Sequence, residues 1–135
     1  MIRTSAALLA AVLIAGCGTR VDEREMNYLA SALTKVSASV DATVRYGDLP
    51  TGQSSDQVLA ASTKHDSNLL KPFSDRRVLV QVVGKDSAVL ICDLKTGNAL
   101  LEDAGCTAKM DSHRWTSPLT GQCEFTLDVA TLCSR

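Results

Sequence analysis

Residues Val78–Leu94 read VLVQVVGKDSAVLICDL, and they predict a β-hairpin around which the rest of the chain is arranged. The first part, Val78–Val83, is β-branched and apolar on nearly both faces, which is typical of a central strand. Gly84–Ser87 (GKDS) supplies a loop, and Ala88–Leu94 (AVLICDL) follows as the returning strand. An antiparallel sheet is therefore expected.

Two further segments predict strands beside this hairpin. Lys95–Asn98 (KTGN) forms a second turn, and Ala99–Glu102 follows it as a short strand. Cys123–Val129 (CEFTLDV) alternates between apolar and polar residues, with Cys123, Phe125, Leu127 and Val129 on the buried side, as in a half-buried strand. We expect three or four strands in total.

The residues before the hairpin predict helices. Residues 22–45 predict one long helix or two shorter ones, because their apolar side chains recur at spacings of three and four and form one stripe: Met26, Leu29, Leu33, Val36, Val40 and Val44. Turn-forming residues follow at Tyr46–Gly52. Ser54 and Gln57 then predict a capping box that opens a second helix reaching about Lys64. Helices first and strands after predict a two-layer α+β domain, with N-terminal helices packed on an antiparallel sheet of three or four strands.

Length and charge restrict the class of protein. The chain has 135 residues, with 14 Lys and Arg against 15 Asp and Glu, and a formal net charge of −1. This length suits one domain, because two cores would each be too small. The near-neutral charge lacks the basic footprint of a nucleic-acid binder, so no nucleic-acid partner is expected.

The first seventeen residues predict a targeting signal. A short positive region, Met1–Arg3, precedes the apolar run Ser5–Ala15 (SAALLAAVLIA). Its eleven residues are too few to span a bilayer as a helix, which takes about 20, but they suit the apolar part of a secretory signal. The run ends at Ile14-Ala15-Gly16-Cys17. This stretch resembles the lipobox of bacterial lipoproteins, in which an aliphatic residue and two small residues precede an invariant cysteine.

The resemblance implies a division of the chain into three parts. Residues 1–16 would be the signal peptide, residues 17–21 a lipid-modified tether, and residues 22–135 a single periplasmic domain. Acyl chains on Cys17 would hold the protein in a membrane. Gly18 follows the cysteine in place of the aspartate that marks inner-membrane retention, which favours the outer membrane. The alternative is an ordinary cleaved signal peptide with an incidental cysteine.

Four of the five cysteines remain once Cys17 is assigned to lipid. Cys92, Cys106, Cys123 and Cys133 form an even set, as expected for two disulfides in a small exported domain. Three pairings are possible. If Cys123–Val129 is a straight strand, Cys133 lies far from Cys123, whereas Cys106 and Cys123 flank an irregular segment whose ends can meet. We therefore expect Cys106–Cys123 with Cys92–Cys133. No C-x-x-C spacing supports a redox pair or metal site, and no cofactor is expected.

Motifs for catalysis are lacking in the sequence, so we expect no enzyme. Asp111, Ser112 and His113 are adjacent along the chain and cannot face one another as a triad does. Three carboxylates near strand ends, Asp93, Glu102 and Asp103, are the rival candidates for acid–base chemistry. Simple solvation is the more common role of such groups.

Two segments are candidate contact surfaces. Arg114 and Trp115, beside His113, are residue types that dominate binding hot spots, although a lone tryptophan also commonly packs into a core. Arg76 and Arg77 are placed to meet lipid phosphate or simply to be solvated. Together these observations favour a lipid-anchored envelope lipoprotein with a non-catalytic role, as a protein-binding accessory or inhibitor module. The alternatives are a ligand binder or enzyme directed at peptidoglycan or lipid, and a purely structural envelope lipoprotein.

Overall fold

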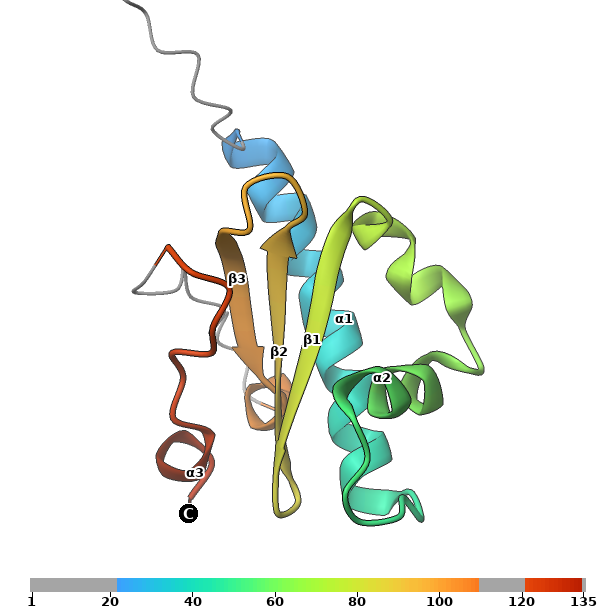
Figure 1. Cartoon of the computed structure of the whole chain (residues 1–135). Helices are drawn as coiled ribbons and strands as arrows, with labels where there is room; N and C mark the ends of the chain where they lie inside the picture. Colours follow the sequence, from blue (N-terminus) through green and yellow to red (C-terminus); the bar gives the residue numbers. More distant parts are fainter. Residues whose placement is uncertain (1–21, 110–120, 135) are drawn as a thin grey trace, which may run out of the picture.

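The computed structural model describes residues 22–109 and 121–134, and within them it has an α+β fold with helices packed against a three-stranded antiparallel sheet (Figure 1). The elements in chain order are α1 (Glu23–Tyr46), α2 (Ser55–Thr63), the 3₁₀ helix η1 (Ser67–Phe73), β1 (Arg76–Val83), β2 (Asp86–Asp93), β3 (Ala99–Ala104), the 3₁₀ helix η2 (Gly105–Lys109) and α3 (Val129–Leu132). The predicted fold class is confirmed, with three strands.

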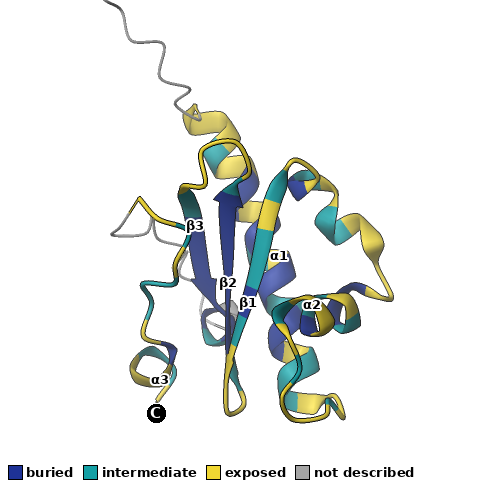
Figure 2. Cartoon of the chain, in the orientation of Figure 1, coloured by how far each residue is buried: buried dark blue, intermediate teal, exposed yellow. Residues whose placement is uncertain are grey.

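The two predicted helices form where their sequence signals lie. The side chain of Asp22 accepts a hydrogen bond from the Glu25 N–H at 2.8 Å and caps the start of α1. The capping box of Ser54 and Gln57 opens α2, with both of its reciprocal hydrogen bonds present. The apolar stripe of α1 is buried against the sheet, as Figure 2 shows along the middle of the helix. These local signals therefore predicted both helices correctly.

The sheet order is β1-β2-β3, so the central strand is β2. The prediction that Val78–Val83 is the central strand is wrong, because β1 lies at the edge, and its end residues Val82 and Val83 are 42% and 41% exposed. In place of a further strand, α2 lies against the outer edge of β1, where the Ser55 hydroxyl accepts the Val80 N–H at 2.7 Å. Apolar residues on both faces of β1 therefore did not indicate its place in the sheet.

The two faces of the sheet are covered by different parts of the chain. The α1 side carries the main core, which combines helix and strand residues: Leu29, Leu33, Val36, Val40, Val80, Val89, Ile91 and Leu101. Residues 121–128 descend beside β3 toward α3 (Figure 1).

The predicted fourth strand over Cys123–Val129 is wrong. Its neighbourhood contributes one isolated bridge, Asn98 with Gln122, and Val129 already begins α3. Instead, the buried carboxylate of Glu102 accepts hydrogen bonds from the N–H and the hydroxyl of Thr126. The Glu102 side chain thus bonds a backbone N–H that a neighbouring strand would otherwise pair. The alternation of apolar and polar residues in the sequence could not reveal this contact.

The structure holds two disulfides, but their pairing differs from the expected one. Cys92 pairs with Cys123 and Cys106 with Cys133, each pair with 5.7 Å between α-carbons. The expected Cys106–Cys123 and Cys92–Cys133 pairing is therefore wrong. The cause is the path of the C-terminal segment along β3. Its bridge at Asn98 brings its first cysteine to Cys92 near the β2–β3 turn, and its last cysteine reaches Cys106 just beyond the end of β3.

Candidate functional site

The large apolar side chains that remain exposed lie toward the two ends of the domain. Tyr46, Val82 and Val83 lie where α1 ends and β1 turns into β2. We call this the distal end, and it includes the loop of residues 47–54. Tyr28 and Leu94 lie toward the opposite, proximal end, where α1 begins and β2 turns into β3. Two hollows, of about 380 and 460 Å³, lie at the distal end.

The distal loop is shaped by glycine at two positions. The Gly47 N–H donates to the Thr43 carbonyl at 2.9 Å and closes the last turn of α1. A Cβ atom at residue 47 would lie only 2.4 Å from that same oxygen, so a larger residue would push the loop away. Gly52 has a φ of +77°, in the left-handed region that favours glycine. The loop places Leu49 so that it lines both hollows.

The first hollow has a volume of about 380 Å³, and apolar side chains from α1, the loop, α2 and β1 line it together with the polar loop residues Thr51 and Gln53. The apolar residues are Val44, Leu49, Pro50, Val58 and Val82. The volume is at the small end of the range for ligand pockets. The apolar wall suits one or two apolar side chains presented by another molecule.

The second hollow is larger, about 460 Å³, and has charged residues in its lining. It lies between the end of α1 and the segment that follows α2, and Tyr46, Asp48, Lys64, His65 and Asp66 contribute to its lining. Tyr46 is 76% exposed beside it. The mixed charges and the aromatic ring can hydrogen-bond and stack with a polar partner.

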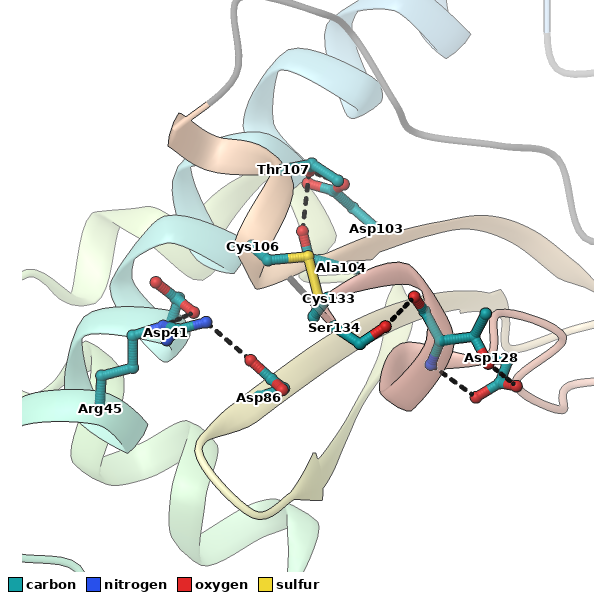
Figure 3. Close-up of a disulfide and its surroundings, with 11 residues drawn as sticks. Asp41, Arg45, Asp86, Asp103, Ala104, Cys106, Thr107, Asp128, Cys133 and Ser134 are labelled. Atoms are coloured by element: carbon teal, nitrogen blue, oxygen red, sulfur yellow. Dashed lines mark hydrogen bonds and ion pairs between the residues drawn. A yellow bond between two sulfur atoms is a disulfide. The ribbon is translucent and has the colours of Figure 1, made fainter.

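An ion-pair network links the elements at this end (Figure 3). The Arg45 Nε lies 2.9 Å from Asp41 Oδ1 on the preceding turn of α1, and its Nη2 lies 2.7 Å from Asp86 Oδ1 at the start of β2. The hydrogen bond that Arg45 donates to Asp41 raises the pKa of Arg45 above its already high value, so the guanidinium stays charged. Because Arg45 ties the end of α1 to the β1–β2 turn, two sides of the distal end are held together before anything binds.

Several residues predicted to act lie outside the described part of the chain. Cys17 and the contact candidates His113, Arg114 and Trp115 are among them, so their roles stay predictions. Arg76, one of the two candidates for lipid phosphate, pairs instead with Glu25 at 2.7 Å and Asp75 at 2.9 Å, and its side chain is only 8% exposed. Arg77 is exposed.

The three rival carboxylates do not meet in one site. Asp93 lies at the β2–β3 turn, where it accepts the N–H groups of Lys95 and Thr96 at 2.7 and 3.0 Å. Glu102 and Asp103 are neighbours on β3, so strand alternation directs them to opposite faces. Glu102 contacts the C-terminal segment, whereas Asp103 accepts a hydrogen bond from the Thr107 hydroxyl at 2.7 Å. No pair of them converges for acid–base catalysis.

Asp103 makes the stability of the domain depend on pH. Burial raises the pKa of Asp103, although the Thr107 hydroxyl opposes the shift. A raised pKa in the folded state means that protonated Asp103 favours folding, and that this contribution is lost as the pH rises through the folded-state pKa. We expect Asp103→Asn to keep the acceptor for Thr107 without titrating. Its free energy of unfolding, relative to wild type, should therefore rise as the pH increases from below 4 to 7 in urea denaturation.

Asp93→Asn is the matched control for this experiment. Hydrogen bonds from the Thr96 and Lys95 N–H groups lower the pKa of Asp93, so its ionised form favours folding and that contribution is lost as the pH falls. The free energy of unfolding of Asp93→Asn, relative to wild type, should therefore fall as the pH increases. The variant should be least stable, relative to wild type, near neutral pH. A pH-independent difference for Asp103→Asn would contradict the assignment.

In residues 22–109 and 121–134, no group of three or more His, Cys, Asp or Glu side chains is placed to hold a metal ion. Over those same ranges no helix is both long and apolar enough to cross a membrane. The fold and surface define the class as a disulfide-bonded α+β domain with a hollowed distal end. Comparison with protein-family models, curated proteins and solved structures found no match.

The distal end is the part of the site that sequence reasoning missed. The residues Tyr46–Gly52 predicted only a break between helices. The available signal was Leu49-Pro50, an apolar pair among turn formers, since apolar residues in a loop commonly pack over a neighbouring element. Which elements they would meet depended on the docking of α2 and β1, and the local sequence carries no information about that.

Proposed function

We propose that this protein is a lipid-anchored lipoprotein of a bacterial envelope that acts as a non-catalytic protein-binding module, either an accessory factor or an inhibitor. The stretch Ile14-Ala15-Gly16-Cys17, at the end of an eleven-residue apolar run, carries the anchoring part. The two disulfides support a location in the bacterial envelope. They use four of the five cysteines and leave Cys17 over, and disulfides persist in oxidising compartments such as the periplasm.

The binding part rests on the distal end. Exposed Tyr46, Val82 and Val83 stand around two hollows that Arg45 and the loop glycines hold in shape. Aromatic and apolar side chains at a preformed concave surface are the usual centre of a protein interface. An acyl anchor would raise the local concentration of this surface at the membrane. The proposed partner is therefore another envelope protein.

The matched variants Tyr46→Ala and Tyr28→Ala test the binding surface. Both tyrosines are exposed on α1, at 76% and 60%, but toward opposite ends of the helix. We expect in-cell crosslinking of tagged full-length protein, followed by mass spectrometry, to capture one dominant envelope protein. Tyr46→Ala should reduce that capture at least tenfold, as loss of a hot-spot residue does, and Tyr28→Ala should leave it unchanged.

Other outcomes of the same experiment select other functions. If the partner is lost on changing Arg114 or Trp115 but not Tyr46, the 113–115 segment is the contact and the distal end is not. Capture of only abundant membrane proteins, equally by all variants, would contradict the binding module and favour a structural lipoprotein. Anchoring is tested separately. Mass spectrometry should find acyl chains on an N-terminal Cys17, and Cys17→Ser should release the protein from membranes.

The second hollow favours a ligand-binding role as the second candidate. Its rim of Tyr46, Asp48, His65 and Asp66 offers hydrogen-bonding groups and an aromatic face to a polar ligand such as a peptidoglycan fragment. Such a fragment should raise the melting temperature of the wild-type protein but not of His65→Ala if this second function holds.

A further inference from the structure

Leu94 is an apolar side chain that the fold leaves in solvent at the proximal end. It is 60% exposed and directly follows β2. Its neighbour Asp93 pairs in register with Arg76 of β1, and Arg76 bonds Glu25 in the first turn of α1 at 2.7 Å. Leu94 therefore lies at the end of the domain where α1 begins, and Figure 1 shows the β2–β3 turn beside the start of that helix.

The chain between Cys17 and the domain is short. Five residues, 18–22, separate Cys17 from Glu23, the first residue of α1. Six residue steps extend to at most about 20 Å, so the start of α1 cannot lie farther than this from a lipid-modified Cys17. The 24 residues of α1 span about 36 Å at 1.5 Å per residue. The proximal end is therefore within reach of the bilayer surface, and the far end of α1 lies about 36 Å from the residue at which the tether joins the helix.

The charged residues at the proximal end do not favour lipids of one charge over another. Acidic and basic residues there nearly balance: Asp22, Glu23, Glu25, Asp75 and Asp93 against Arg24, Arg76, Arg77 and Lys95. A balanced surface gains little from anionic head groups. An exposed leucine gains free energy when it is buried in an apolar environment, whatever the charge of the head groups. Contact with the membrane at this end would thus be apolar and largely independent of lipid charge.

We infer that Leu94 inserts into the interfacial region of the bilayer that holds the acyl chains of Cys17, so that the domain stands on its proximal end and presents the distal hollows away from the membrane. This orientation rests on the proposed lipid anchor at Cys17. It gives the anchored domain a second membrane contact, and two contacts restrict the tilt of the domain more than the anchor alone would.

The test uses full-length lipidated protein with Leu94→Trp, and Val83→Trp as the matched control. Val83 is also exposed, at 41%, but lies at the distal end. Each protein is placed in zwitterionic phosphatidylcholine vesicles whose acyl chains carry bromine, which quenches tryptophan fluorescence on contact. The wild-type protein, with Trp115 as its one tryptophan, supplies the baseline to subtract. We expect Leu94→Trp to lose at least half of its added fluorescence and Val83→Trp to lose none.

The Val83→Trp control distinguishes the proposed orientation from a general attraction of exposed tryptophan to the bilayer. If tryptophan itself drew any exposed site to the bilayer, Val83→Trp would be quenched too, and equal quenching would overturn the proposed orientation. Vesicle flotation is measured on the same samples. Protein that floats with the vesicles but shows no quenching of Leu94→Trp overturns the orientation while leaving the anchor intact. Protein that does not float overturns the anchor and the orientation with it.

Discussion

Replacing Cys92 and Cys123 together by alanine should lower the free energy of unfolding by about 3–4 kcal/mol. A disulfide restricts the unfolded chain, and the restriction grows with the length of the loop it closes. The two cysteines are 31 residues apart in sequence, and the Cys106–Cys133 pair is 27 apart. Loops of this size correspond to about 3.6 kcal/mol each in the chain-entropy treatment. Urea denaturation of the non-reduced proteins measures the loss.

A crossed variant tests the pairing itself. With Cys92–Cys123 and Cys106–Cys133 as the disulfides, Cys92→Ala with Cys123→Ala leaves the second disulfide whole and creates no free thiol. Cys92→Ala with Cys133→Ala instead breaks both disulfides and leaves Cys106 and Cys123 unpaired. We expect no free thiol in the domain of the first variant. The second variant should lose about twice as much free energy of unfolding as the first. The opposite ranking would favour the pairing expected from sequence.

Leu33→Ala should lower the free energy of unfolding by about 3–4 kcal/mol through loss of core packing. Leu33 lies near the middle of α1, is fully buried, and belongs to the core cluster that α1 forms with Val89 and Leu101 of the sheet. Truncating a buried leucine removes its transfer free energy and leaves a cavity that the neighbours fill only in part. The midpoint of urea denaturation should fall while the slope of the transition stays constant.

Leu94→Ala is the matched control for Leu33→Ala. The same side-chain atoms are removed, but Leu94 is 60% exposed, so the change in unlipidated protein should stay within about 0.5 kcal/mol. If Leu33→Ala cost no more than Leu94→Ala, α1 would not be packed on the sheet as described. A change in the slope would instead point to an altered unfolded state.

Local sequence signals predicted most of the regular structure because they act over a few residues. The apolar stripe of 22–45 and the Ser54–Gln57 capping box predicted the helical spans of α1 and α2, and the structure decided that the first span is one helix and not two. The β-branched hairpin of Val78–Leu94 likewise became β1 and β2. In these segments, periodicity, capping and turn chemistry all favour the same structure.

The predictions that failed concern partners distant in sequence. The edge position of β1 follows from α2 lying against it, and the irregular path of residues 121–128 follows from the contact between Glu102 and Thr126. The disulfide pairing depended on that path. An alternating segment can be a strand only if backbone groups are available to pair with it, and here a carboxylate occupies that place.

The candidate site divides in the same way. A lipobox-like stretch is contiguous, so the sequence alone carries the proposed anchor at Cys17. The distal hollows are lined by residues of α1, α2, β1 and the intervening loop, and no single segment marks them. Sequence reasoning therefore proposed the 113–115 segment as a contact and missed Tyr46 and Leu49.

By itself, the sequence determined the helical segments, the hairpin and the number of disulfides, because each depends on neighbouring residues or on counting. Only the tertiary structure decided which strand is central, which cysteines pair, and which exposed side chains gather around hollows. Those outcomes depend on the docking of elements far apart in the chain, where burial of apolar area selects an arrangement that no local pattern encodes.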